Sequence, residues 1–229
     1  MLPDHSAQHK SNLQSYFDGV GFDRWSAIYG GEEDLSYVRR MVQQGHDRML
    51  GTAIRWLQDR CAGGSLLDAG CGTGLFSLAM ATRGFQVMGV DIAPNMVNEA
   101  KRHAKRAGLE RDAIFVAGDL ATVAGTYDAV ACFDVLVHYP AGMFETMCET
   151  LAQKSNNTLL LTYAPYNRML ATLHWIGGKF PQGNRRTEIQ MIRDDVVEKT
   201  LAQCGMTVQR REVINQGFYH VKLIEAVRV

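Results

Sequence analysis

The chain has 229 residues, of which 46% are hydrophobic and 21% are charged, a composition typical of a folded globular protein. Its 24 Lys and Arg residues balance 24 Asp and Glu residues. This composition excludes a disordered chain, a collagen and a coiled coil, and the zero net charge excludes a globally basic surface for nucleic acid.

The residues that precede the core are predicted to form a lid and a lead helix over residues 1–60. An aromatic and glycine-rich segment, YFDGVGFDRWSAIYGG, is followed by apolar residues at 3- and 4-residue spacing up to Leu57, which predicts an amphipathic helix. The opening MLPDHSAQHK lacks the apolar core of a secretion signal, and no apolar run approaches the ~18 residues of a membrane span.

The core, residues 61–229, shows short apolar runs that alternate with helical patterns. The runs are 65–68, 86–91, 113–117, 127–133 and 158–163. Such alternation predicts a parallel sheet with helices on both faces. Residues 164–193 form an expected insertion on the substrate side, because open α/β sheets hold ligands at the carboxyl ends of their strands.

The last two apolar runs depart from this alternation of strands and helices. MTVQRREVI and FYHVKLIEAV are separated only by residues 215–217, too few for a crossover helix, so they are predicted to form an antiparallel hairpin. The expected fold is therefore an α/β single domain, 1–229, with a seven-stranded, mostly parallel sheet, a C-terminal antiparallel hairpin and an N-terminal helical, aromatic lid.

A glycine-rich loop follows the first predicted strand, in SLLDAGCGTGLFSLAMA. Gly70, Gly72 and Gly74 turn the chain from Asp68 into a helix near Leu75. Leu75 stands where a dinucleotide fingerprint needs its third glycine, and the Gly-Lys-Ser/Thr of a phosphate loop is absent from the sequence. Without a pyrophosphate to hold, Asp68 is better suited to a cationic or amino-bearing ligand.

Two more carboxylates end the next two strands. Asp91 lies about 20 residues past the loop, where an acidic side chain accepts hydrogen bonds from ribose hydroxyls. Asp119 follows the third strand and suits an exocyclic amine. Three carboxylates at consecutive strand ends indicate a nucleoside with a positive neighbour.

The loop from Leu67 to Gly74, together with Val90-Asp91, resembles the class I S-adenosylmethionine-dependent methyltransferases. The resemblance implies a Rossmann-like fold, S-adenosylmethionine as cofactor and S-adenosylhomocysteine as product. It assigns cofactor binding to Asp68, Gly70, Cys71, Gly72, Gly74, Asp91, Ile92, Met96, Asp119, Leu120 and Asp134. From the residues alone, Asp134 could equally be a turn residue.

Residues outside this core carry a narrower resemblance. They are the N-terminal aromatic segment, Gly45-His46, the stretch Asp-Val-Leu-Val-His-Tyr-Pro that ends at Pro140, and Phe218-Tyr219. Together they resemble the magnesium-protoporphyrin IX methyltransferase family of chlorophyll and bacteriochlorophyll biosynthesis. This resemblance implies methylation of one propionate of magnesium protoporphyrin IX. The magnesium would come with the substrate, so no protein-bound metal is expected.

The same resemblance points to residues on the substrate side. His138 and Tyr29 are expected to be catalytic, and contacts with the porphyrin are expected from Tyr16, Phe17, Phe22, Trp25 and Tyr139. His138 could orient the carboxylate or ligate the porphyrin magnesium, and the preference of magnesium for oxygen favours the carboxylate.

Two other functions are compatible with the sequence. One is O-methylation of a phenolic or quinone-like molecule, with His138 as base; the other is a non-catalytic S-adenosylmethionine-binding module. The family implies the large subunit of magnesium chelatase as a partner. Five cysteines without a Cys-x-x-Cys motif indicate reduced thiols, so the chain is expected in the cytoplasm, with peripheral contact to photosynthetic membranes left open.

Overall fold

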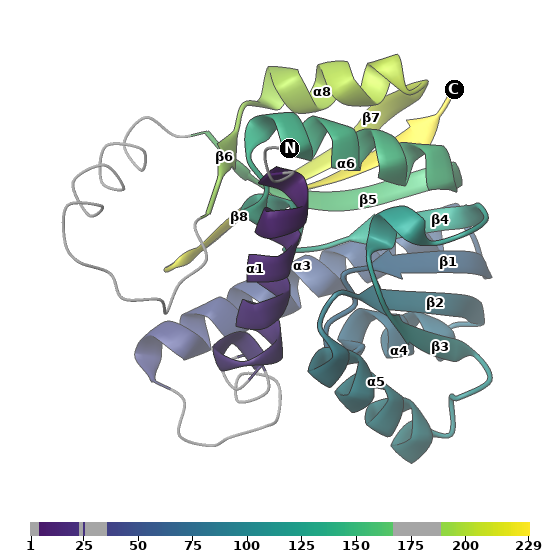
Figure 1. Ribbon diagram of the computed structural model, residues 1–229. Coiled ribbons are helices and arrows are strands. Elements are labelled where there is room, and N and C mark those ends of the chain that lie inside the picture. Colours follow the sequence, from purple (N-terminus) through teal and green to yellow (C-terminus); the bar gives the residue numbers. More distant parts are fainter. Residues whose placement is uncertain (1–4, 23–24, 26–35, 167–188) are drawn as a thin grey trace.

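A computed structural model of the chain describes residues 5–22, 25, 36–166 and 189–229. The strands form one sheet in the order β3-β2-β1-β4-β5-β8-β7, and a short strand, β6, pairs with β5 outside this path (Figure 1). Seven of the strands thus make the predicted continuous sheet, and β6 is an addition that the sequence pattern did not indicate.

The elements follow the predicted alternation closely. The strands are β1 (Gly64–Ala69), β2 (Phe85–Asp91), β3 (Ala113–Ala117), β4 (Tyr127–Cys132), β5 (Ser155–Pro165), β6 (Met191–Ile192), β7 (Met206–Gln216) and β8 (Tyr219–Arg228). The helices are α1 (His5–Asp18), α3 (Tyr37–Arg60), α4 (Leu75–Ala81), α5 (Pro94–Ala107), α6 (Ala141–Lys154) and α8 (Asp194–Gln203), with short 3-10 helices η1 (Leu120–Thr122) and η2 (Leu136–His138).

The C-terminal hairpin is antiparallel, as predicted, but its turn is shorter. β8 pairs antiparallel with both β5 and β7 and therefore lies between them. The ladder continues through Asn215 and Gln216, so that only Gly217 and Phe218 connect the strands, with Gly217 at φ +58°. Glycine permits this left-handed backbone, and the turn thus comprises residues 217–218 in place of the predicted 215–217.

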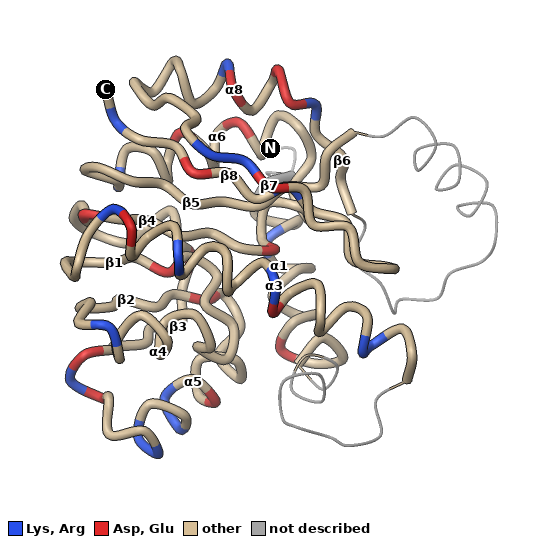
Figure 2. Tube along the Cα trace, turned by 180° about the vertical axis from the view of Figure 1, so that it is seen from behind, with Lys and Arg blue, Asp and Glu red and all other residues tan. Residues whose placement is uncertain are grey.

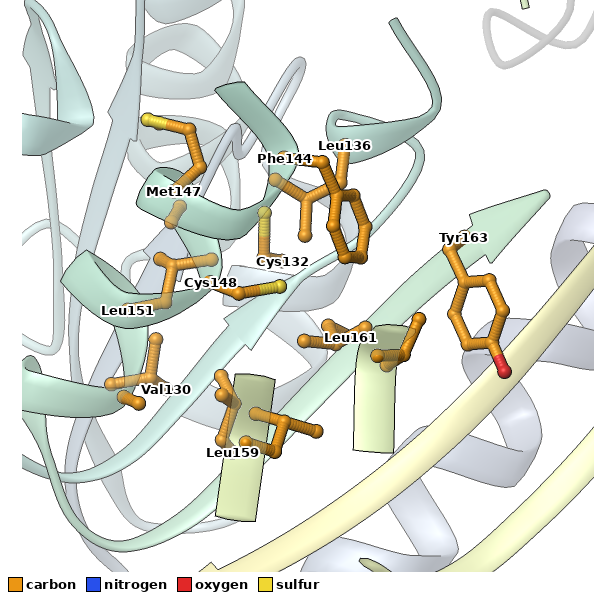
Figure 3. Close-up of a cluster of buried hydrophobic side chains, with 14 of the residues drawn as sticks. Val130, Cys132, Leu136, Phe144, Met147, Cys148, Leu151, Leu159, Leu161 and Tyr163 are labelled. Atoms are coloured by element: carbon orange, nitrogen blue, oxygen red, sulfur yellow. The ribbon is translucent and has the colours of Figure 1, made fainter. Parts of the chain in front are cut away.

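Two hydrophobic layers enclose the sheet because successive strand residues point to opposite faces. Along β4, Val130 and Cys132 join the layer under α6 and α8, whereas Ala129 and Ala131 join the layer under α3, α4 and α5. Figure 3 shows the first layer, where Phe144, Met147 and other residues of α6 pack on β4 and β5. Both faces are therefore covered, as the apolar runs predicted.

A buried carboxylate attaches α3 to the hairpin. Glu225 on β8 is fully buried and accepts hydrogen bonds of 2.9 and 3.0 Å from Arg60 at the end of α3. Arg210 on β7 lies 3.3 Å from the same carboxylate. A buried charge is tolerated only when it is paired, so this cluster holds the orientation of α3 across the sheet.

Charged residues are dispersed over the described surface. Figure 2 shows Lys, Arg, Asp and Glu positions of both signs along α5 and α8, with long uncharged stretches in the central strands. Over the part of the chain that is described, no helix is long and apolar enough to cross a membrane. Of the expected insertion, 164–193, the described residues are 164–166 and 189–193, and they include β6.

Candidate active site

A pocket opens at the carboxyl ends of β1, β2, β3 and β4, where the loops of a parallel sheet gather. Helix α1 stands over this end of the sheet (Figure 1), and α3 contributes from the side. The lining residues are Leu13, Phe17, Trp25, His46, Leu50, Asp68, Gly70, Cys71, Gly72, Thr73, Leu75, Phe76, Val90, Asp91, Ile92, Met96, Gly118, Asp119, Leu120, Phe133, Asp134, Val135, His138 and Tyr139.

The glycine loop joins β1 to α4 through a left-handed backbone. Gly70, Gly72 and Gly74 have φ values of +85°, +52° and +84°. The amides of Gly70 and Cys71 donate to the carbonyl oxygen of Val90 at 2.7 and 3.0 Å, which ties the loop to β2. A side chain at Gly70 would meet Val135 at 2.0 Å, so the loop can pack against Val135 only because glycine stands there.

Gly74 has a different place from its neighbours. It caps the N-terminus of α4 and lies outside the pocket lining. A Cβ atom there would come within 2.9 Å of Phe115 and 3.1 Å of Ala100. Its lack of a side chain therefore serves the packing of α4 in the hydrophobic layer.

Asp68 is a buried carboxylate in the floor of the pocket. It is 2% exposed and accepts a 2.6 Å hydrogen bond from the Ser77 hydroxyl on α4. Burial raises the pKa of this carboxyl to about 7, and the bond from Ser77 opposes that shift. Near neutral pH the group is thus poised between its two protonation states, and a nearby cation would favour the charged one.

Asp91 braces the glycine loop. Its carboxylate accepts hydrogen bonds from the amides of Gly72 and Ala93, both at 2.9 Å. Burial raises its pKa, and these backbone bonds partly offset the effect. Asp119, after β3, accepts from the Ala121 amide at 3.0 Å and forms an ion pair of 2.6 Å with Lys10 of α1.

Asp134 follows β4 in an unusual backbone conformation, with φ at +57°. The Tyr219 hydroxyl donates to both carboxylate oxygens, at 2.8 and 3.0 Å, and the Thr162 hydroxyl lies 3.3 Å from one of them. Burial raises its pKa to about 6, opposed by these bonds. His46 Nε2 lies 3.9 Å away, and burial lowers the pKa of His46 to about 3, which leaves that ring neutral.

Helix α1 contacts three segments around the pocket. Besides the Lys10 pair with Asp119, His9 Nε2 lies 2.9 Å from the carbonyl oxygen of His138, and Asp18 accepts from the Asn95 amide at 2.8 Å. Phe17 packs edge-on against the His138 ring, with 5.3 Å between ring centroids. This helix therefore covers the pocket directly beside His138.

Most of the residues suggested by the sequence lie in the lining. All the candidate cofactor residues except Gly74 are there, and so are His138, Phe17, Trp25 and Tyr139. Tyr16 and Phe22 lie outside the lining, although Tyr16 packs on Phe17 at 5.0 Å. Tyr29 lies outside the described residues.

Several polar residues at the site had not been selected from the sequence. His46 and Lys10 approach pocket carboxylates, and Tyr219 donates to one of them. His103 on α5 contacts the Thr73 carbonyl oxygen of the glycine loop at 3.0 Å. His46 and Tyr219 belong to pairs, Gly45-His46 and Phe218-Tyr219, that marked the narrower family resemblance, whereas nothing in the sequence pattern singles out Lys10.

The pocket has a negative character. Among the described residues that line it are four aspartates, Asp68, Asp91, Asp119 and Asp134, and no Lys or Arg, and only Asp119 is paired with a lysine, Lys10 of α1. Such a lining suits a cationic ligand and disfavours a pyrophosphate. Within the described ranges, no group of three His, Cys, Asp or Glu residues is placed to hold a metal ion.

Known proteins resemble this chain over nearly its whole length. The family described as "Magnesium-protoporphyrin IX methyltransferase C-terminus" matches residues 132–228, and a general methyltransferase domain family matches residues 66–154. A magnesium-protoporphyrin O-methyltransferase of Synechocystis is 34% identical over 96% of each chain. The chloroplastic magnesium protoporphyrin IX methyltransferase of Arabidopsis thaliana is 35% identical over 95% of this chain and 71% of its own.

A solved structure supports the same relationship. The crystal structure of the Synechocystis magnesium protoporphyrin IX methyltransferase with bound S-adenosylhomocysteine superposes with a TM-score of 0.87 at 33% identity, covering 96% of this chain and all of that one. The expected methyltransferase fold, with its antiparallel C-terminal strands, is thereby confirmed.

Proposed function

The chain belongs to the magnesium-protoporphyrin IX methyltransferase family, and from this premise we propose the reaction in detail. It transfers a methyl group from S-adenosylmethionine to a propionate carboxylate of magnesium protoporphyrin IX. The products are the monomethyl ester, an intermediate of (bacterio)chlorophyll biosynthesis, and S-adenosylhomocysteine.

The observation that carries the cofactor assignment is the charge of the pocket. S-adenosylmethionine, when bound, supplies an electrophilic methyl group on a positively charged sulfonium. Four aspartates line the described pocket, and three of them, Asp68, Asp91 and Asp134, have no Lys or Arg partner there, which fits that cation. The glycine loop, with its open left-handed turn at Gly72, leaves backbone free to lie against the methionine part.

The carboxylates at the ends of β2 and β3 suit different parts of the adenosine. Asp91 is suited to the ribose hydroxyls, as an acidic residue at the end of a second strand is in nucleotide-binding sheets. Asp119 is suited to the adenine amine, and Ile92, Met96 and Leu120 offer apolar surface to the ring. In this assignment Lys10 shares the Asp119 carboxylate with the adenine amine.

The acceptor requires positioning and does not require a base. A propionate resembles the Glu side chain, whose pKa is about 4.3 in water, so it is already ionised at neutral pH. Phe17, Trp25 and Tyr139 would exclude water and present apolar surface to the porphyrin. His138, in the pocket lining beside Phe17, would orient the carboxylate for in-line attack on the methyl group.

The reaction is tested by incubating the protein with methyl-labelled S-adenosylmethionine and magnesium protoporphyrin IX. We expect label in an alkali-labile ester of the porphyrin. Label in an alkali-stable phenol ether, when quinone-like acceptors are supplied, would instead identify a phenolic O-methyltransferase. Binding of S-adenosylmethionine without transfer to any of these acceptors would indicate a non-catalytic module.

Cofactor binding should depend on pH. Asp68 and Asp134 have pKa values raised to about 7 and about 6 in the ligand-free protein, and a cation binds their ionised forms. The dissociation constant of S-adenosylmethionine should therefore rise about tenfold per pH unit below about pH 7, and more steeply below about pH 6. Isothermal titration calorimetry from about pH 8 to about pH 5 measures this dependence.

The same pKa shifts predict the opposite trend for stability without ligand. Because folding raises both pKa values above the 3.8 that is usual for an aspartate in water, ionisation costs the folded state free energy. The contribution of these two groups to stability is complete below about pH 4 and is lost as the pH rises through about 6 to 7. For cofactor binding, a dissociation constant of S-adenosylmethionine that does not change with pH would contradict the proposed contact between these carboxylates and the cofactor.

The porphyrin is poorly soluble, so we propose that it is delivered by the large subunit of magnesium chelatase. The aromatic side chains of Phe17 and Trp25 in the pocket lining suit the binding of a flat ring that is passed between proteins. A pull-down at low salt with the purified subunit tests this hypothesis. We expect recovery of the subunit, and its absence from the bound fraction would contradict direct delivery.

We also propose a peripheral contact with photosynthetic membranes. Tyr37 at the start of α3 is 72% exposed, and Phe218 in the hairpin turn is 65% exposed. The turn lies against α3, because a side chain at Gly217 would meet Met41 at 3.0 Å. Flotation with anionic vesicles should carry the wild type upward more than a Tyr37→Ser/Phe218→Ser variant, and equal flotation would contradict this contact.

A further inference from the structure

Asp134 is held in a conformation that its own backbone does not favour. Among the residues that the structure describes, it is the one non-glycine residue with a positive φ, +57°. Such conformations persist only where the surroundings impose them, and they cluster at functional sites. The contacts that impose this one lie on elements far from Asp134 in the sequence.

Two hydroxyl groups fix the residue from neighbouring strands. Thr162 on β5 accepts a 2.7 Å hydrogen bond from the Asp134 amide, and its hydroxyl lies 3.3 Å from the carboxylate. The Tyr219 hydroxyl at the start of β8 donates to both carboxylate oxygens, at 2.8 and 3.0 Å. Backbone and side chain of Asp134 are thus both held, with the residue in the pocket lining.

Helix α3 is shaped to admit the Tyr219 ring. A Cβ atom at Gly45 would lie 2.5 Å from Tyr219 Cδ1, so only glycine permits this approach. The next residue, His46, faces the ring at 6.3 Å between centroids and approaches Asp134 at 3.9 Å. Gly45, His46 and Tyr219 therefore form one packed unit around the carboxylate.

No protein cation neutralises Asp134 within the described site. The groups that face its carboxylate there are the Tyr219 phenol, the Thr162 hydroxyl and the neutral ring of His46, while the nearby strand ends carry Asp68 and Asp91. The Asp134 side chain is only 16% exposed, and a carboxylate so largely removed from water is unfavourable without a cationic partner. The ligand is expected to supply that charge.

The order of the strands suggests which part of the ligand does so. Asp119, Asp91, Asp68 and Asp134 follow or end β3, β2, β1 and β4, which are neighbours in that order. If the adenine lies at Asp119 and the ribose at Asp91, the methionine part lies toward β1 and β4. Its two positive groups are the sulfonium and the α-ammonium, and only the ammonium donates hydrogen bonds.

We propose that Tyr219 and Thr162 are positioning residues that hold Asp134 as the hydrogen-bond acceptor for the α-ammonium group of the cofactor. The inference rests on the proposed function. It makes the C-terminal hairpin part of the cofactor site, although Tyr219 does not itself line the pocket.

The test measures binding of two probes by isothermal titration calorimetry. S-adenosylhomocysteine carries the amino-acid part, and 5′-methylthioadenosine lacks it. For Tyr219→Phe and Thr162→Val, we expect the dissociation constant of S-adenosylhomocysteine to rise about tenfold and that of 5′-methylthioadenosine to change less than about twofold. Thr162→Ser keeps the hydroxyl and should bind S-adenosylhomocysteine nearly as the wild type does.

A pH profile provides a second readout. The Tyr219 bond lowers the pKa of Asp134, so its removal should move the loss of S-adenosylhomocysteine affinity to higher pH. Tyr163→Phe is the matched control. The Tyr163 hydroxyl on β5 donates a 2.8 Å hydrogen bond to Asp194, and neither residue lines the pocket. This control should lose stability without changing the affinity or the pH profile.

The outcomes distinguish a failure of the proposed function from a failure of the assignment of Asp134 to the ammonium group. If the wild type binds neither probe, the proposed function fails. If the wild type binds both and the variants weaken both equally while thermal melting shows them folded, Tyr219 and Thr162 support the pocket as a whole and the assignment to the ammonium is wrong. Unchanged affinities at every pH would also overturn it.

Discussion

His138→Ala is expected to lower kcat about 100-fold, because an acceptor that is no longer oriented seldom reaches the in-line geometry that methyl transfer needs. The side chain lines the pocket on η2 and packs against Phe17 at 5.3 Å. The dissociation constant of S-adenosylmethionine should stay within about twofold of the wild type, since the proposed role is on the acceptor side. Steady-state kinetics with calorimetry on the same preparations separates the two quantities.

A matched variant is available on the hairpin. His220→Ala removes another histidine, on β8, that does not line the pocket, and its kinetics should match the wild type. Parallel losses of turnover and of cofactor affinity in His138→Ala would mean that the ring supports the cofactor, and the acceptor-side role would have to be abandoned.

Gly70→Ala should abolish most cofactor binding. The new methyl group would lie 2.0 Å from Val135 Cγ2, on a backbone with φ at +85°. Val135 has a short, stiff side chain and cannot move aside cheaply, so the loop must shift and lose its bonds to the Val90 carbonyl oxygen. We expect affinity for S-adenosylhomocysteine to fall at least about 100-fold and the free energy of unfolding to fall by about 2–4 kcal/mol.

Calorimetry and urea denaturation measure these two effects, and a second glycine serves as the control. Gly51 lies within α3, and a Cβ atom there would meet nothing within 4 Å. Gly51→Ala should leave binding unchanged and raise the free energy of unfolding by about 0.5–1 kcal/mol, because alanine favours a helix. Wild-type affinity in Gly70→Ala would show that the loop does not lie against the ligand.

The acidic strand ends and the glycine loop of the pocket could be predicted from the sequence because these residues obey a local rule. Asp68, Asp91 and Asp119 end or follow apolar runs, and parallel strands bring their carboxyl ends to one edge. The glycine spacing distinguished this loop from the phosphate-binding ones. Gly74 obeys the same spacing, yet it packs against Phe115, since spacing does not reveal which side of a loop meets the ligand.

The contacts that the rest of the chain makes with the pocket residues could not be predicted from local sequence patterns. Lys10 reaches Asp119 across 109 positions of sequence, and Tyr219 reaches Asp134 across 85. Such contacts depend on where α1 lies and on the insertion of β8 between β5 and β7. Neither arrangement leaves a periodic pattern in the residues.

The sequence by itself determined the alternation of strands and helices, the antiparallel end of the sheet and the row of acidic strand ends. These follow from side-chain periodicity and backbone freedom, which act over a few residues. Only the tertiary structure decided that Tyr219 and Thr162 hold Asp134, that His46 stays neutral beside it and that α1 covers His138. Those properties arise from burial and from contacts between distant segments, which exist only once the chain has folded.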